Sequence, residues 1–140
     1  EPQSAFSAQL RAKFANNPLV QVWTAGLGVQ SERLPMRYTG TDAASFVGAG
    51  ETSGSYELFA WEPSDVRLFY CNIEGYEHVL FPYLIEAGFI AGVDQVAVQV
   101  HADVEQGTPL GVWSAALRGT HDLLWKSPVG DWYGWRRKDA

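Results

Sequence analysis

Apolar and polar residues alternate along residues 96–105 more regularly than anywhere else in the chain. The apolar side of this segment consists of Val96, Val98, Val100, Ala102 and Val104. The polar side carries Gln99, His101, Asp103 and Glu105. Because side chains alternate between the two faces of a β-strand, this period of two predicts a strand within residues 93–105 whose valine side is core.

A spacing of four residues predicts a helix at the start of the chain. Phe6, Leu10 and Phe14 would form one apolar stripe, and Ser4 stands where a helix cap is favoured. The Asn-Asn-Pro sequence at 16–18 ends this pattern, because proline disfavours helical geometry in the residue before it.

A second helix is predicted near residues 76–87. Pro82 stands inside it, and proline fits the first turn of a helix better than the interior, so we expect the regular helix to begin there. Gly88 suits the position just after its end. Glu74 and His78 are four residues apart and would share one face if this segment is helical throughout.

The other apolar segments are rich in β-branched and aromatic residues, which favour strands. They cover residues 19–27, 33–38, 55–61, 65–73, 110–117 and 122–125. The Glu-Pro-Ser sequence at 62–64 has turn chemistry, so we expect 55–61 and 65–73 to form a hairpin. Both sides of 65–73 carry large apolar groups, which favours a central strand covered on both faces. Residues 40–54 are small, polar and glycine-rich and predict a long loop.

These segments predict an α+β fold, because strands and helices do not alternate regularly. We expect an N-terminal helix followed by a mostly antiparallel, curved sheet of about five to seven strands, with one further helix near residues 76–87. The chain has 140 residues, close to the commonest size of one domain, and no segment has the composition of a linker. We therefore expect a single globular domain over residues 1–140.

The composition excludes several protein classes. Hydrophobic residues make up 46% and charged residues 19%, which is typical of a globular protein and not of a disordered one. Cys71 is the one cysteine, so we expect it to be a small buried hydrophobe and not part of a disulfide-built secreted scaffold. No apolar run reaches the length of a membrane helix, so no membrane partner is expected.

The compartment stays open, with a slight preference for a soluble cytoplasmic protein. The chain begins at Glu1 and not at methionine, so a processed secreted form is the alternative. No cofactor is expected. The glycine-rich residues 48–54 lack the lysine of a phosphate-binding loop and include Glu51, which would repel phosphate.

Charge is distributed unevenly along the chain. The net charge is −6, and between Thr39 and Leu117 there are eleven acidic residues and one basic residue, Arg67. Such an acidic region repels a phosphate backbone and attracts a basic protein. The tail at 132–138 mixes aromatic and basic residues that could stack on nucleic-acid bases, but it is short and attached to an acidic body, so no nucleic-acid partner is expected.

The first functional hypothesis is a non-enzymatic binding protein whose acidic, aromatic-rich surface engages a basic protein, as an inhibitor or an immunity-type protein would. Six tryptophans exceed what a small core needs, and tryptophan and tyrosine are enriched at protein interfaces. The predicted partner-binding residues are Glu57, Trp61, Glu62 and Asp65. A structural or assembly subunit is a further possibility, and an acidic surface without any partner is the plain alternative.

The second hypothesis is a small pocket enzyme or ligand-binding domain with a His/Asp general base on the strand 96–105. His101 is flanked by Asp103 and Glu105, and carboxylates beside an imidazole raise its pKa above about 6.5 and fix its tautomer. The same three residues could bind a divalent metal, although no metal site is predicted. The plain alternative is a polar strand face in water. A concave pocket at this face would favour the enzyme, and an open, flat face would favour the partner binder.

Overall fold

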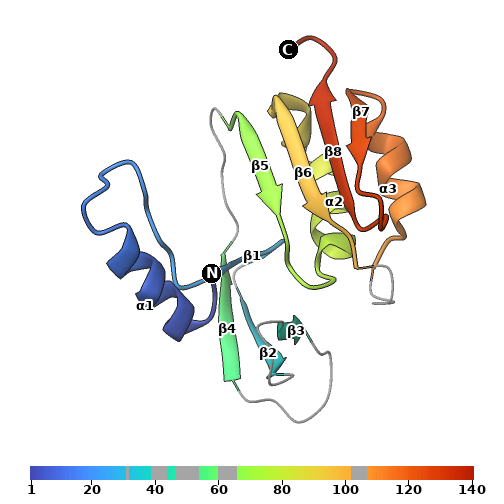
Figure 1. The fold of residues 1–140 in the computed structure, drawn as a ribbon. Helices are drawn as coiled ribbons and strands as arrows, with labels where there is room; N and C mark the ends of the chain where they lie inside the picture. Colours follow the sequence, from blue (N-terminus) through green and yellow to red (C-terminus); the bar gives the residue numbers. More distant parts are fainter. Residues whose placement is uncertain (31, 39–43, 47–53, 60–65, 102–106) are drawn as a thin grey trace. The chain divides into compact units, whose positions relative to one another are not determined.

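The computed structural model describes residues 1–30, 32–38, 44–46, 54–59, 66–101 and 107–140 (Figure 1). For the strands between residues 32 and 59 only the backbone is described. The chain groups into two compact units, Glu1–Trp61 and Glu62–Ala140, and each is described by itself. A single domain over residues 1–140 therefore stays a prediction.

Unit 1 combines one helix with a small mixed sheet. Helix α1 spans Ser4–Lys13, as the apolar spacing predicts, although the residue at its N-cap is Gln3 and not Ser4. The strands are β1 (Gly26–Leu27), β2 (Glu32–Tyr38), β3 (Ala44–Phe46) and β4 (Gly54–Phe59). They are ordered β1-β4-β2-β3, with β1 parallel to β4 and the other pairs antiparallel.

Unit 2 places two helices on one face of a second four-stranded sheet (Figure 1). The elements are β5 (Leu68–Cys71), α2 (Glu77–Glu86), the short 3-10 helix η1 (Ile90–Gly92), β6 (Gln95–Gln99), α3 (Leu110–Leu117), β7 (His121–Lys126) and β8 (Trp132–Arg137). The sheet order is β5-β6-β8-β7. Strands β5 and β6 are parallel, and β8 is antiparallel to both of its neighbours.

A chain of aromatic rings attaches the two helices of unit 2 to the sheet. Phe69 of β5 contacts Phe81 of α2 at a centroid distance of 5.8 Å, and Phe81 stacks on Trp113 of α3 at 4.8 Å. Trp113 lies 6.1 Å from Trp135 of β8. All four rings are buried. Aromatic pairs of this kind add about 0.5–1.5 kcal/mol each to the free energy gained from burial. These four rings are therefore a main source of stability for unit 2.

The predicted valine alternation is confirmed in its first half. Val96, Val98 and Val100 are all buried beneath the helices. Strand β6 ends at Gln99, earlier than predicted, and residues 102–105 lie outside the described part of the chain. The α+β class is also confirmed, but the strands in the described residues form two four-stranded mixed sheets and not one mostly antiparallel sheet.

Several predicted elements are wrong in type or pairing. Residues 110–117 form helix α3 and not a strand, because Trp113 and Leu117 are four apart and both face the core. Residues 132–138, which the sequence indicated only as an aromatic and basic tail, contain strand β8. Strands β4 and β5 belong to different sheets, so the expected hairpin does not form. Strand β5 is an edge strand with an exposed face and not a central one.

Two further boundaries differ from the prediction. The segment predicted as a strand over 19–27 is a strand only at Gly26–Leu27. The second predicted helix is confirmed, but α2 begins at Glu77, and Pro82 lies inside it instead of at its start.

The buried valine side of β6 can be tested directly. We expect Val98→Asp to lower the free energy of unfolding by about 3 kcal/mol or more, because it puts an unpaired charge between the sheet and the helices. Urea unfolding followed by circular dichroism measures this. Gln95→Asp is the matched control, since Gln95 is exposed on the same strand. Equal stability of the two variants would contradict the observed register.

Candidate functional site

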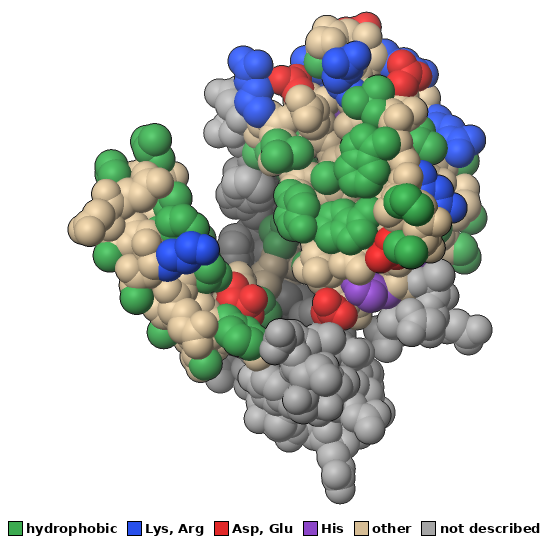
Figure 2. Space-filling model, viewed as in Figure 1, with side chains coloured by type: hydrophobic (Ala, Val, Ile, Leu, Met, Phe, Trp, Pro, Cys, Tyr) green, Lys and Arg blue, Asp and Glu red, His purple; other side chains and the backbone are tan. Residues whose placement is uncertain are grey.

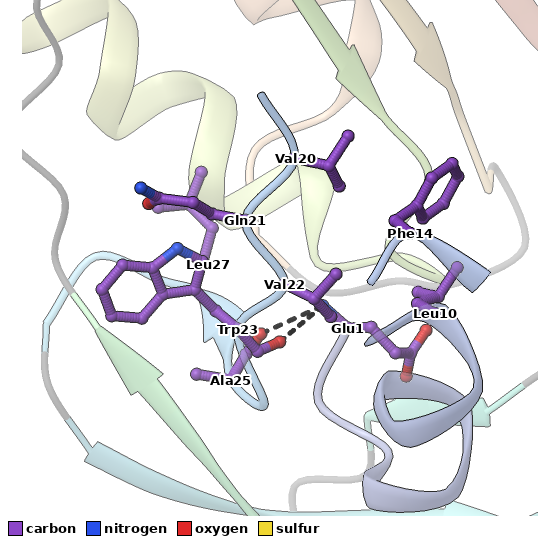
Figure 3. A pocket seen from close by; sticks show the side chains of 9 residues that line it. All are labelled: Glu1, Leu10, Phe14, Val20, Gln21, Val22, Trp23, Ala25 and Leu27. Carbon is purple, nitrogen blue, oxygen red and sulfur yellow. Dashed lines mark hydrogen bonds between the residues drawn. The ribbon is translucent and has the colours of Figure 1, made fainter. Parts of the chain in front are cut away.

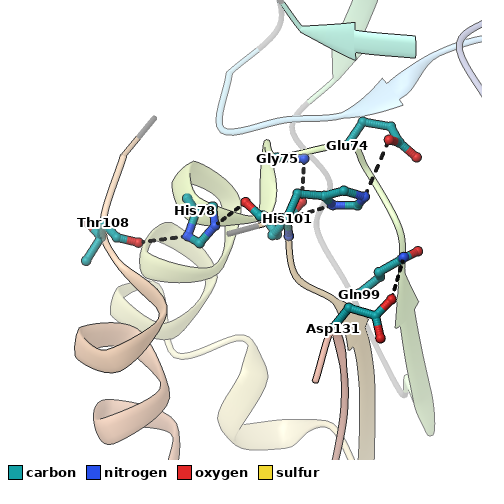
Figure 4. Close-up of polar contacts among 8 residues, drawn as sticks. Glu74, Gly75, His78, Gln99, His101, Thr108 and Asp131 are labelled. Atoms are coloured by element: carbon teal, nitrogen blue, oxygen red, sulfur yellow. Dashed lines mark hydrogen bonds and ion pairs between the residues drawn. The ribbon is translucent and has the colours of Figure 1, made fainter. Parts of the chain in front are cut away.

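His101 lies two residues after the end of β6, at the carboxyl ends of the parallel strands β5 and β6 (Figure 4). The start of α2 and the loop that precedes it lie at the same end of the sheet. In sheets with parallel strands this is the end at which ligands usually bind. The position of His101 therefore makes its surroundings the first candidate site.

A buried carboxylate, that of Glu77 in the first turn of α2, organises this site. One oxygen, Oε1, accepts hydrogen bonds from the backbone N–H of His101 (2.6 Å) and from its ring Nδ1 (2.9 Å). The other, Oε2, accepts from the N–H of Gly75 (2.9 Å). The side chain of Glu77 is 0% exposed. Burial alone would raise the pKa of Glu77, but these bonds and the nearby imidazole outweigh burial and hold the pKa below its ordinary value.

The carboxylate of Glu77 fixes the orientation of the His101 ring. An ionised carboxylate only accepts hydrogen bonds, so Nδ1 of His101 must carry the proton. The other ring nitrogen, Nε2, then lies 3.4 Å from Oε2 of Glu74. The His101 side chain is 19% exposed, so it is largely shielded from water but not sealed. Glu74 has a φ of 53°, an uncommon conformation for a residue other than glycine.

His78, in the same turn of α2, contacts two residues that are far from it along the sequence, His101 and Thr108. Its ring Nε2 lies 3.1 Å from the carbonyl oxygen of His101, and its Nδ1 lies 3.1 Å from that of Thr108. The carbonyl oxygen of His78 accepts the N–H of Thr108 at 2.8 Å. That carbonyl is available because Pro82, four residues later, has no N–H to donate to it.

Gly107 is required by this close approach. Its φ is +78°, and a Cβ at this position would collide with the main-chain carbonyl group of His78. The absence of a side chain therefore allows the loop before α3 to reach the first turn of α2.

Cys71 lies at the end of β5 and does not add a nucleophile to this site. It is buried, and burial, with a smaller contribution from the charge of Glu77, raises the pKa of the thiol. The thiol therefore stays protonated, and Cys71 is the small buried hydrophobe that the sequence predicts.

The predicted site residues separate into two groups. The structure brings His101 together with Glu74, Glu77 and His78. The sequence did not predict the contacts of His101 with Glu74 and Glu77. Its predicted partners Asp103 and Glu105 lie outside the described residues.

Of the predicted partner-binding residues, Glu57 belongs to β4, for which only the backbone is described. Trp61, Glu62 and Asp65 lie outside the described residues. Glu77 was missed, although an acidic residue in the first turn of a helix after a parallel strand is a signal that could have identified it.

The face of the unit 2 sheet opposite its two helices carries a second candidate site, the aromatic platform, which we define as Tyr70, Trp125 and Trp132. Tyr70 and Trp132 have ring centroids 5.0 Å apart. Tyr70 is 65% and Trp125 47% exposed. Figure 2 shows the resulting apolar patch on this face.

Small residues on this face of the sheet leave room for the ring of Trp125. The register across the sheet places Tyr70, Ala97, Gly134 and Trp125 in one row. The indole of Trp125 lies where a side chain of Gly134 would begin. One face of this indole therefore rests on the sheet and leaves the other toward solvent.

Charged groups border the aromatic platform. Asp131 directly precedes Trp132, and its pKa is lowered, first by the hydrogen bond from the Ser127 hydroxyl (2.6 Å) and then by donors including Gln99 Nε2 (3.1 Å). Figure 2 shows acidic side chains and a histidine below the apolar patch and a mixture of basic and acidic side chains above it. The border of the aromatic platform that includes Asp131 therefore favours a cationic ligand group.

Unit 1 contains a cavity of about 390 Å³, within the size range of small-molecule sites (Figure 3). It is lined by Glu1, Leu10, Phe14, Val20, Gln21, Val22, Trp23, Ala25 and Leu27. The lining is mainly apolar, with one carboxylate and one amide.

Comparison of the chain with protein-family models, with curated proteins and with solved structures finds no match. Within the described ranges, no helix is long and apolar enough to cross a membrane. Nor does the described part of the chain bring together three or more His, Cys, Asp or Glu side chains that could hold a metal ion.

The role of Glu77 predicts a pH dependence. The pKa of Glu77 in the folded protein lies below the ordinary 4.5, so its ionised form adds stability above that pH, and this is lost as the pH falls through the folded value. We expect Glu77→Gln to be less stable than wild type at neutral pH and the difference to shrink on acidification. Urea unfolding at a series of pH values measures this.

The control for this experiment is Glu86→Gln, because Glu86 is exposed at the other end of α2. Its stability should follow that of the wild type at every pH. A destabilisation by Glu77→Gln that is the same in acid and at neutral pH would show that the carboxylate charge is not what the site uses.

Proposed function

We propose that this chain is a non-enzymatic binding protein that engages a basic protein partner, and that the aromatic platform is part of its contact surface. The observation that carries the proposal is the exposure of Tyr70 and Trp125 together on the face of the unit 2 sheet opposite its two helices. Apolar side chains that are exposed singly need no explanation, but a contiguous aromatic patch is typical of an interaction site.

The chemistry of the aromatic platform supports a protein partner. Tyrosine and tryptophan offer a large contact area and lose little conformational freedom on binding, so they supply much of the binding energy at interfaces. The rings of Tyr70 and Trp132 already contact each other, which restricts them further before a partner arrives. Preorganisation of this kind lowers the entropic cost of association.

The charge of the chain supports a basic partner. Its net charge is −6, and acidic residues are concentrated between Thr39 and Leu117. Such a charge attracts a basic protein and accelerates encounter. Glu57, Trp61, Glu62 and Asp65 stay predicted contacts on this basis. A role as an inhibitor or immunity-type protein is the form of the proposal that best fits a small acidic chain.

Substitution of the aromatic platform tests the proposal. We expect Tyr70→Ala to weaken binding of the physiological partner about tenfold or more, because truncation of a central tyrosine removes a large contact. The partner is obtained by affinity capture with the wild-type chain, purified, and its dissociation constant measured by calorimetry. Tyr83→Ala is the matched control, since Tyr83 is an exposed tyrosine on α2, on the helix layer of unit 2.

A partner that binds Tyr70→Ala as tightly as the wild type would refute the contact surface. An association rate that does not fall with added salt would refute the electrostatic part of the proposal, because charges at the border of an interface act mainly on encounter.

A second candidate function is proton transfer by His101, in a small enzyme or ligand-binding domain. The observation that favours it is the hydrogen bond from Nδ1 of His101 to the buried Glu77, which leaves Nε2 as the basic nitrogen. A general base needs this combination of a fixed tautomer and a carboxylate behind the ring. Asp103 and Glu105 stay predicted members of the site.

The tautomer of His101 tests this candidate without a substrate. We expect ¹⁵N chemical shifts to show the neutral ring protonated at Nδ1 in the wild type, and this preference to be lost in Glu77→Met, whose side chain has no oxygen to accept the Nδ1 proton. His121 is the internal control, because its ring is buried and its contacts are to Thr120 and Val93. Neutral His101 protonated at Nε2 in the wild type would argue against a general base held by Glu77.

A further inference from the structure

We infer that the aromatic platform recognises arginine side chains of a basic partner, with the guanidinium group stacked on Tyr70 and Trp132 and paired with Asp131. The inference rests on the proposed function and names the chemistry of the same surface. Three observations support it: ring geometry, an adjoining ionised carboxylate, and a cation that this chain already holds over one of its own rings.

The ring geometry fits a planar cation. The rings of Tyr70 and Trp132 are inclined by 31° with centroids 5.0 Å apart, so they form a tilted, partly overlapping pair whose outward face can receive a stacking group. A guanidinium group stacks parallel to such rings and is attracted when it lies within about 6 Å of a ring centre.

Asp131 supplies the opposite charge beside the rings. Its Oδ1 accepts from the hydroxyl of Ser127 (2.6 Å), and its Oδ2 accepts from Nε2 of Gln99 (3.1 Å). The backbone N–H groups of Asp131 and Trp132 also lower the pKa of this carboxylate, so the paired N–H donors of an arginine would share its roughly four acceptor sites with these donors. The Ser127 hydroxyl also accepts the backbone N–H of Asp131 and of Trp132 (3.1 Å each), which holds the carboxylate and the indole in a fixed relation.

A lysine of this chain gives an internal example of the same interaction. Nζ of Lys126 lies 5.1 Å from the ring centre of Tyr133, on the neighbouring strand pair β7–β8. Tyr133 faces the other side of the sheet from Trp132, so this cation leaves the aromatic platform itself available.

Charge distinguishes arginine from a nucleic-acid base as the stacking group. A nucleotide on Trp132 would bring its phosphate toward Asp131 and toward Glu74 at the same end of the sheet. At the other end, Arg136 lies directly opposite Asp122 on the neighbouring strand, so its charge is partly offset there. The platform therefore favours a cation over a polyanion.

The experiment follows the indole N–H signals of the six tryptophans by NMR while defined probes are added to the full chain. The probes are an oligo-arginine peptide, oligo-lysine and oligo-citrulline peptides of the same length, and an oligothymidylate. We expect oligo-arginine to shift the signals of Trp125 and Trp132 and to leave those of the buried Trp113 and Trp135 unchanged. Oligo-lysine should bind about two- to fivefold more weakly, and oligo-citrulline should not bind.

Two pairs of variants assign the contacts. Tyr70→Ala and Asp131→Asn should each weaken oligo-arginine binding about two- to fivefold. Tyr83→Ala and Asp139→Asn, which change an exposed tyrosine and an exposed aspartate elsewhere in unit 2, should leave it unchanged.

The outcomes separate this inference from the proposed function. Guanidinium recognition is wrong if oligo-arginine leaves the signals of Trp125 and Trp132 unshifted, or if only oligothymidylate shifts them. In that case, loss of partner binding in Tyr70→Ala would still support the proposed contact surface. If oligo-arginine binds as expected but the partner binds Tyr70→Ala normally, the proposed contact surface fails on its own test.

Discussion

The arrangement of unit 2 depends on one buried carboxylate, that of Glu77. It receives three hydrogen bonds, two from His101 and one from Gly75, and so joins the end of β6 to the loop that precedes α2. A buried charge with fewer donors would carry a large desolvation penalty. The neighbouring His78 extends the connection to Thr108, so one turn of α2 contacts both His101 and Thr108.

The sheet of unit 2 separates stability from recognition by its two faces. The face toward the helices is filled by valines and by the ring chain from Phe69 to Trp135. The other face combines Ala97 and Gly134 with large rings from both edge strands. A glycine in a strand interior costs stability, and here it allows the indole of Trp125 to lie flat on the sheet.

Short periodic runs were sufficient to predict α1 and the valine side of β6. The residue types of 33–38 and the positions of Pro82 and Gly88 were sufficient to predict β2 and α2. Residues 110–117 were misassigned because nearly every position is apolar or small, so the strand and helix periods both fit. The hairpin between 55–61 and 65–73 failed because pairing is decided by sheets that distant residues complete. Glu77 was missed for the same reason: its donors come from residues up to 24 positions away.

A backbone hydrogen bond joins the two candidate sites of unit 2. The backbone N–H of Val100 donates to the carbonyl oxygen of Asp131 at 2.7 Å, and the next residue, His101, is held by Glu77. A ligand that displaces Asp131 therefore acts on the strand end that positions His101. Because Glu77 supports this shared strand end, a loss of partner binding in a Glu77 variant would not identify the contact surface. Tyr70 is more than half exposed on an edge strand, so its truncation can report on binding alone.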